Sequence, residues 1–154
     1  TDSVWIDLSK GLGCPIGGVL AGSHEFIEKS WLWKQRLGGS MRQSGMMAAA
    51  GIFALDNNIE RLEDDHKNAR LLAEKLSKIK GIEINPSLVE TNIVICKVTS
   101  EKSSARELVT KLSKIGIRIG ALSERELRIV THLDVNEKQI YKAVEEISKI
   151  MLTA

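Results

Sequence analysis

The start of the chain has the hydrophobic pattern of two short strands followed by a helix. Val4, Ile6 and Leu8 fall at every second position, which favours a β-strand. A glycine turn leads into a second predicted strand over residues 17–23. From residue 23 to residue 37 apolar side chains recur at helical spacing, and the paired glycines that follow end the predicted helix.

Two further helices are predicted in the middle of the chain. Residues 45–58 are almost wholly apolar, and a helix that is apolar all round is buried against its neighbours. We therefore expect a core or interface helix here, and self-association of the isolated chain through the stretch Met46 to Leu55. Residues 59–79 combine an apolar face, which includes His66, with a charged face, and Gly81 is the expected stop.

The remaining residues are predicted to form a small layered α/β unit. Strands are expected over residues 82–85, 91–98, 117–120 and 127–132, and amphipathic helices over 104–116 and 136–152. The first of these two helices opens with Ser104 and Glu107 at the spacing of a capping box.

The character of the sequence changes between a glycine-rich, apolar first part and a charged, regular second part. We place a domain boundary between them, so that residues 1–55 and 56–154 form separate regions. Two strands are too few for an independent sheet, so region 1–55 is expected to be the end of a larger one. The chain also opens without an initiating Met, and we expect it to be a piece of a longer protein whose other part lies upstream.

Composition and charge argue against several classes of partner. The 154 residues are 43% hydrophobic and 27% charged, as in a globular domain. A net charge of +2, from 22 basic and 20 acidic residues spread along the chain, argues against a nucleic-acid surface. The longest apolar run is about half of the ~20 residues that a membrane span requires, so no membrane partner is expected. Cys14 and Cys96 lack metal-ligand spacing, and we expect reduced thiols in a cytoplasmic protein without a metal site.

Lys10 is the first residue with candidate chemistry. It lies after the first strand in the stretch DLSKGLGCPIGG, where glycines let the backbone approach a ligand and where α/β enzymes place active groups. The residue order of a P-loop is absent. A lysine on a loop is usually a solvated surface residue, so the residues alone leave both interpretations open.

Two arginines are further candidates. Arg42 lies on a loop before the apolar helix, where a guanidinium beside a helix N-terminus suits a phosphate or carboxylate. A structural arginine that satisfies carbonyl groups is the alternative. Arg128 is expected on the strand face opposite Leu127, Ile129 and Thr131, where it either holds a carboxylate or lies on a solvated sheet surface. The three histidines are scattered and are expected to be structural.

Four stretches, in this order, strongly resemble the low-specificity L-threonine aldolase family of pyridoxal-phosphate enzymes: DSVWIDLSKGLGCPIGGVLAGS, LGGSMRQSGMMAAAG, ERLEDDHKNARLLAEKL and LRIVTHLDV. The resemblance implies an α/β fold class, the C-terminal portion of a PLP-dependent transferase-like fold of the aspartate aminotransferase type. Region 1–55 would then be the end of the cofactor-binding large domain, with the PLP lysine and an interface helix. Region 56–154 would be a linker helix and a small C-terminal domain.

The resemblance also implies roles for the three candidates. Lys10 matches the catalytic lysine that bonds to the aldehyde of pyridoxal 5'-phosphate. Arg42 matches an arginine that helps bind the cofactor phosphate across a subunit interface, and Arg128 matches the arginine that binds the amino-acid carboxylate. Gly18 departs from the serine that relatives often have at this position.

The implied reaction is the cleavage of L-threonine, L-allo-threonine or another β-hydroxy-α-amino acid to glycine and an aldehyde, in a cytoplasmic homo-oligomer, dimer or tetramer. The groups that hold the pyridine ring, and the histidines near the substrate hydroxyl, are expected in the upstream part. The 154-residue chain alone is therefore expected to be inactive.

Two other functions stay open. A truncated relative could serve as a non-catalytic interaction or dimerisation domain through its apolar helix. The same fold also supports other PLP-dependent lyases and transaminases, because a fold does not determine the reaction.

Overall fold

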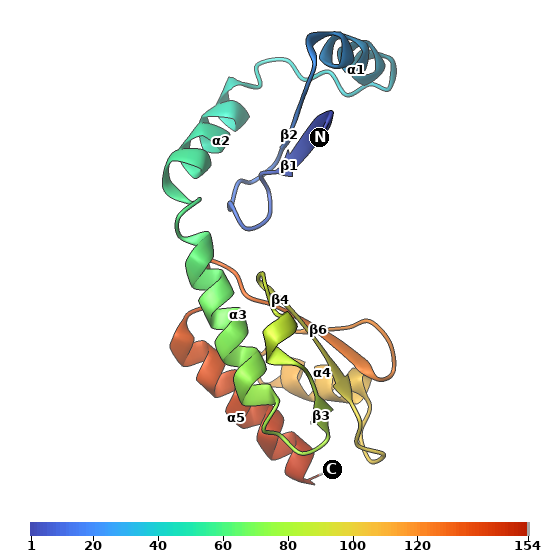
Figure 1. Cartoon of the computed structure of the whole chain (residues 1–154), viewed down its shortest axis with the longest axis vertical. Helices are drawn as coiled ribbons and strands as arrows, with labels where there is room; N and C mark the ends of the chain where they lie inside the picture. The colour runs from blue at the N-terminus through green and yellow to red at the C-terminus, as the bar shows by residue number, and fades with distance from the viewer. Residues whose placement is uncertain (154) are drawn as a thin grey trace. The chain divides into compact units, whose positions relative to one another are not determined.

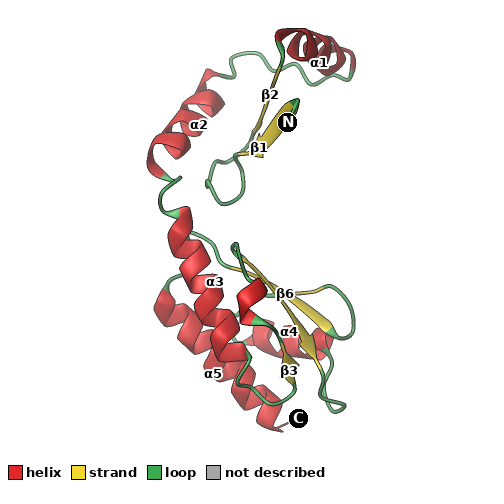
Figure 2. Cartoon of the chain, in the orientation of Figure 1, coloured by secondary structure: helices red, strands yellow, loops and turns green. Residues whose placement is uncertain are grey.

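The computed structural model describes residues 1–153, and the chain separates into two compact units, Thr1–Leu62 and Glu63–Ala154 (Figure 1). The first unit holds two strands and two helices, and the second holds a sheet with three α-helices (Figure 2). The boundary expected after residue 55, and the roles given to the two regions, stay predictions.

The first unit begins with an antiparallel pair of strands. β1 (Ser3–Asp7) pairs with β2 (Gly18–Gly22), with Trp5 opposite Leu20 in the register. Helix α1 (His24–Arg36) follows at once, because the side chain of Ser23 accepts a hydrogen bond from the Phe26 N–H and caps its first turn. Both strands and this helix match the hydrophobic pattern, but none of their residues is buried.

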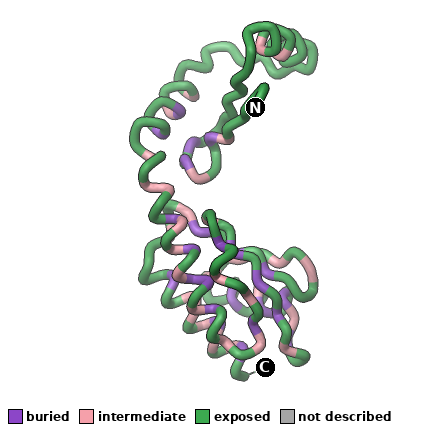
Figure 3. The backbone as a smooth tube through the Cα atoms, in the orientation of Figure 1, coloured by how far each residue is buried: buried purple, intermediate pink, exposed green. Residues whose placement is uncertain are grey.

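The buried residues of the first unit lie at the loop after β1 and at helix α2 (Gly45–Asn57) (Figure 3). Leu8, Leu12 and Cys14 from the loop form a small core with Ala54 of the helix. Beyond the helix end, Asn58 Nδ2 donates to the Leu12 carbonyl at 2.8 Å. The loop is therefore held by apolar and polar contacts to one helix and the residue that follows it.

Helix α2 is exposed over most of its apolar surface. Only Gly51 and Ala54 are buried in it, whereas Met46, Ile52 and Phe53 are 77%, 62% and 63% exposed. The expected burial on several sides is therefore not provided by the described residues of this chain. A uniformly apolar helix that its own chain leaves uncovered is suited to an interface.

The second unit is a four-stranded antiparallel sheet with helices on one face. The strand order is β3-β4-β6-β5, with the strands at Ile82–Glu83, Ile93–Val98, Glu126–Val130 and Gly120–Ala121. A short 3₁₀ turn (Pro86–Leu88) lies between β3 and β4. The helices are α3 (Leu62–Leu76), α4 (Ala105–Lys114) and α5 (Glu137–Thr153).

Alternation along the two central strands determines which sheet face the helices cover. Val94, Cys96 and Val98 of β4, with Leu127 and Ile129 of β6, join buried residues of all three helices in one core. The intervening side chains of both strands lie on the opposite, exposed face.

The strand expected over residues 117–120 is wrong in its position. The ladder includes only Gly120 and Ala121, because the chain leaves α4 with Gly116 at a φ of +82° and with the Ile117 N–H bonded to the Leu112 carbonyl. Ile117 and Ile119 nevertheless pack against the core, which explains their apolar alternation.

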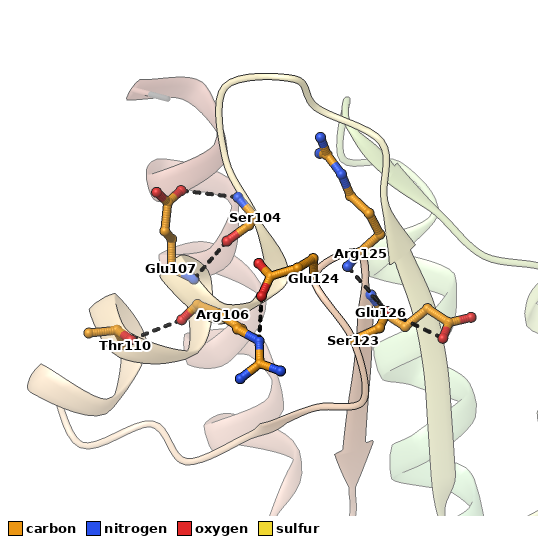
Figure 4. Close-up of polar contacts among 8 residues, drawn as sticks. All are labelled: Ser104, Arg106, Glu107, Thr110, Ser123, Glu124, Arg125 and Glu126. Atoms are coloured by element: carbon orange, nitrogen blue, oxygen red, sulfur yellow. Dashed lines mark hydrogen bonds and ion pairs between the residues drawn. The ribbon is translucent and has the colours of Figure 1, made fainter.

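The predicted capping box at the start of α4 is present (Figure 4). Ser104 Oγ accepts from the Glu107 N–H at 3.2 Å, and Glu107 Oε2 accepts from the Ser104 N–H at 3.0 Å. The same helix end is tied to the turn before β6 by an ion pair between Arg106 Nε and Glu124 Oε1 at 2.6 Å. These contacts fix where α4 begins.

Replacement of the capping residue tests this helix start. We expect Ser104→Ala to lower the free energy of unfolding of the second unit by about 1 kcal/mol, because an N–H of the first turn loses its acceptor. Ser113→Ala, near the other end of the helix, serves as the matched control. Denaturant unfolding followed by circular dichroism measures both, and equal losses would contradict the assigned cap.

Candidate active site

Lys10 lies in a tight turn between β1 and β2. The Leu8 N–H donates to the Gly17 carbonyl at 2.9 Å, and the Cys14 N–H donates to the Leu8 carbonyl at 3.0 Å. Within the turn the Gly13 N–H donates to the Lys10 carbonyl at 2.8 Å, and Gly13 has a φ of +74°, which favours glycine. Backbone geometry therefore fixes where the lysine begins, while its side chain is 73% exposed.

The Lys10 ammonium contacts two side chains of β1. Its Nζ lies 2.6 Å from Asp7 Oδ2, in an ion pair, and 5.8 Å from the centre of the Trp5 ring. Asp7 is held in turn by Ser9, whose N–H and hydroxyl both donate to Oδ1, at 3.0 and 2.7 Å. The pKa of Asp7 falls from 3.8 to about 2, chiefly because Lys10 donates to the carboxylate and then because Ser9 does.

The Trp5 ring lies directly over Gly18. A Cβ atom placed on Gly18 would meet Trp5 Nε1 at 2.5 Å, so the ring occupies the space that a side chain at this position would need. A larger side chain at position 18 would therefore require the Trp5 ring to move.

Arg42 lies just before helix α2, as expected, and its side chain is exposed. Within residues 1–153 it makes no ion pair or hydrogen bond to another side chain. The following Ser44 makes no side-chain cap hydrogen bond to α2. Arg42 therefore lies three residues before a helix whose first N–H groups receive no hydrogen bond from the Ser44 side chain, an arrangement that suits an anion.

Arg128 lies on the exposed face of β6, with Ile95 and Gly120 as its cross-strand neighbours. The expected division of faces is confirmed, because Leu127, Ile129 and Thr131 are buried on the other side. Arg128 has no ion-pair partner in the described part of the chain. The neighbour on β5 is a glycine without a side chain, and the neighbour on β4 is the apolar Ile95.

The three candidate residues are divided between the two compact units. Lys10 and Arg42 belong to the first unit, and Arg128 belongs to the second. The sequence pattern did not indicate that Asp7 and Trp5 contact Lys10, although it places these two residues on the strand just before the turn.

His24 and His132 each lie near a carboxylate. No cluster of three metal-ligating side chains occurs among the described residues.

Comparison with known proteins identifies the family. The model of the beta-eliminating lyase family matches residues 1–99, which include the whole Lys10 turn, Arg42 and helix α2. The chain belongs to the beta-eliminating lyase family.

None of the helices in residues 1–153 has both the length and the apolar character that crossing a membrane requires.

Two of the relatives are low-specificity threonine aldolases. The chain is 39% identical to low-specificity L-threonine aldolase 1 of Arabidopsis thaliana over 153 residues, 99% of this chain and 43% of that protein. It is 40% identical to the low specificity L-threonine aldolase of Escherichia coli K12 over 139 residues, 90% of this chain and 40% of that protein. The resemblance stated from the motifs is confirmed, and the chain spans about two fifths of the length of these relatives.

Solved structures confirm the fold class. A structure from Listeria monocytogenes has a TM-score of 0.75 at 21% identity, covering 96% of this chain and 44% of that one. The 8-amino-7-oxononanoate synthase of Francisella tularensis has a TM-score of 0.72 at 19% identity, covering 97% and 45%. At these identities the likeness concerns the fold, which is the C-terminal portion of the PLP-dependent transferase-like architecture.

The ion pair at the turn predicts an unusual titration of Asp7. We expect its carboxyl to stay ionised at pH 3, with a pKa near 2, and Lys10→Gln to raise that pKa toward 3.8 by removing the main stabilising partner. A depressed carboxyl pKa favours the folded state above pH 3.8, and this contribution is lost as the pH falls toward 2. Carbon-detected NMR of the Asp7 carboxyl measures the titration; a wild-type midpoint near 3.8 would contradict the ion pair.

Proposed function

We propose that this chain supplies the catalytic lysine and two anion-binding arginines of a PLP-dependent aldolase. The enzyme would cleave L-threonine, L-allo-threonine and related β-hydroxy-α-amino acids to glycine and an aldehyde. The observation that carries the proposal is the exposed Lys10 amine on a backbone-fixed turn, in a chain 39% and 40% identical to two threonine aldolases. A cytoplasmic location fits the two free thiols, Cys14 and Cys96.

The first unit offers a chemical partner for the aldehyde of the cofactor and another for its phosphate. Pyridoxal phosphate presents an aldehyde, which requires a primary amine, and a phosphate, which requires cationic and N–H donors. Lys10 offers the amine, and Arg42 with the uncapped N-terminus of α2 offers the donors. When bound, the cofactor supplies an electron sink for the pair released as the Cα–Cβ bond breaks.

Arg128 is assigned to the substrate carboxylate. A guanidinium presents two parallel N–H donors to a carboxylate, which fixes the direction of the amino acid as well as its distance. The exposed position of Arg128 on β6, and the absence of an ion pair to it among the described residues, support this role. Holding the carboxylate sets which bond at Cα is aligned for cleavage, so Arg128 contributes through orientation.

Covalent trapping tests the lysine assignment. We expect borohydride to fix pyridoxal phosphate to Lys10 Nζ in the purified chain, because this amine is exposed on a turn whose backbone is held by hydrogen bonds. Peptide mass spectrometry locates and quantifies the label. Lys29 is the matched control, since it is 70% exposed and also ion-paired at 2.6 Å. Equal labelling of the two lysines would count against a cofactor site at Lys10.

A chimaera tests the reaction. The chain would replace the segment that it matches in the Escherichia coli threonine aldolase, and acetaldehyde and glycine released from L-threonine would be measured. We expect turnover that Lys10→Ala lowers by roughly 10³-fold or more, the scale of losing a covalently acting group. We expect Arg128→Lys to raise KM about tenfold, the equivalent of one charge-assisted hydrogen bond.

The chimaera also separates the alternatives. Arg118→Lys, an exposed arginine without an assigned role, controls for general effects of the Arg128 change. Keto-acid formation in place of glycine would indicate transamination, and a folded but inactive chimaera that fails to label Lys10 would indicate a non-catalytic interaction domain.

We also propose that the protein is a homo-oligomer that associates through α2. The support is the exposed apolar face of this helix, which includes Ile52 and Phe53. We expect the wild-type chain to self-associate at micromolar concentration and Phe53→Glu to shift it toward monomer in sedimentation velocity. Leu88→Glu, at a residue 75% exposed in the second unit, is the control. A monomeric wild type would overturn the assignment.

A further inference from the structure

The contacts around Lys10 restrain its amine in a way that the proposed reaction does not require. The Nζ atom is paired with Asp7 Oδ2 at 2.6 Å and lies 5.8 Å from the centre of the Trp5 ring. Ser9 occupies the other oxygen of the carboxylate through two hydrogen bonds. Ser9 therefore holds the Asp7 carboxylate in place, and the second oxygen, Oδ2, faces the Lys10 amine.

We propose that Asp7 is a positioning residue that holds Lys10 as a paired ammonium and slows its attack on aldehydes until the pair opens. The importance of this restraint for catalysis depends on the proposed function, in which Lys10 reacts with the cofactor aldehyde. The restraint itself is a property of the folded turn and is measurable without a cofactor.

The chemistry of attack explains the effect. An ammonium has no free electron pair, so Lys10 must first release one proton to the buffer. The neutral Nζ then adds to the carbonyl carbon, a C=N double bond replaces C=O, and the oxygen leaves as water. Asp7 Oδ2 lies 2.6 Å from Nζ and the centre of the Trp5 ring lies 5.8 Å from it, so the amine must leave both contacts before it can reach a carbonyl carbon. The restraint thus acts before the bond-forming step.

The other titratable and charged groups at this turn do not replace Asp7. Arg61 packs against it from beyond α2, and its Nη1 donates to the Gly11 carbonyl at 3.5 Å. The Cys14 thiol is buried and donates to the Ala50 carbonyl at 3.4 Å. Among the described residues, Asp7 is the one carboxylate within ion-pair distance of Lys10 Nζ. The depressed pKa of Asp7 keeps this carboxylate charged throughout the neutral range.

Helix α1 provides an internal comparison. Lys29 Nζ is also 2.6 Å from a carboxylate oxygen, that of Glu25, and the two lysines are similarly exposed, at 70% and 73%. The carboxylates differ, because the Glu25 side chain is 78% exposed whereas that of Asp7 is 19% exposed and is held by Ser9. An anchored carboxylate loses less freedom on pairing, so its pair is populated more of the time.

Competitive reductive methylation of the intact chain tests the proposal. Formaldehyde with cyanoborohydride at pH 7.5 labels each lysine in proportion to the reactivity of its amine, and peptide mass spectrometry gives the rate at every site. We expect Asp7→Asn to raise the Lys10 rate about two- to fivefold, the range that ion pairs between exposed groups imply. The Lys29 rate should stay unchanged. At pH 11 lysines are largely neutral, and the difference at Lys10 should disappear.

Three variants separate charge from structure. Asp7→Glu restores the anion and should return the Lys10 rate toward wild type. Ser9→Ala keeps the carboxylate but removes the hydroxyl that holds Oδ1, and should give a smaller increase than Asp7→Asn. Glu25→Gln should raise the rate at Lys29 alone. If Asp7→Asn does not fold by circular dichroism, the Ser9→Ala result decides.

The outcomes are distinct from those of the cofactor experiment. An unchanged or slower Lys10 in Asp7→Asn, an increase that persists at pH 11, or no increase in Ser9→Ala when Asp7→Asn is unfolded would overturn the restraint. Formaldehyde has no phosphate and no ring, so this result does not depend on whether pyridoxal phosphate binds. Failure of pyridoxal phosphate to label Lys10 would overturn the proposed function and leave the restraint standing or falling on its own measurement.

Discussion

The candidate site depends on one apolar contact, between the loop that follows β1 and helix α2. Leu8, Leu12 and Cys14 reach Ala54, and Leu8 approaches Gly51 so closely that an added Cβ would lie 3.2 Å from its Cδ1 atom. The strands and α1 contribute no buried residue, so this small cluster is the core of the first unit. The Lys10 backbone is therefore held in position by buried residues before and after it in the chain, Leu8 on one side and Leu12 and Cys14 on the other.

Local chemistry then determines what the lysine does. The Lys10 side chain is mostly exposed, and its amine contacts few protein groups. A carboxylate three residues earlier, a hydroxyl that holds this carboxylate and an indole that lies over a glycine form its surroundings. The ion pair and the two Ser9 hydrogen bonds join residues at most three positions apart, so single substitutions in this short stretch change the site directly.

The second unit follows from simpler rules. Its sheet has one covered face, because alternation along β4 and β6 sends every second side chain toward three amphipathic helices. Arg128 falls at a position of the opposite parity, and the pairing of β6 with β4 and β5 places it between Ile95 and Gly120. The covered face provides the stability that allows a guanidinium to remain on the other face.

Most of the fold was predictable because its elements carry strong periodic signals. Helical spacing located the five α-helices of residues 1–153, and period-two alternation located both central strands and assigned Arg128 to the face opposite Leu127, Ile129 and Thr131. Short strands were harder, since residues 117–119 alternate like a strand but leave α4 through a left-handed glycine. Ile117 and Ile119 are apolar because they pack against the core, and a loop residue can do this as well as a strand residue.

The sequence by itself determined the family, the fold class and the identity of the three candidate residues, because these depend on motifs and on local periodicity. Only the tertiary structure decided which groups touch Lys10 and how much of α2 remains uncovered. The reason is that an ion pair such as Asp7 with Lys10 requires a particular turn, and the turn is closed by contacts with residues more than forty positions away.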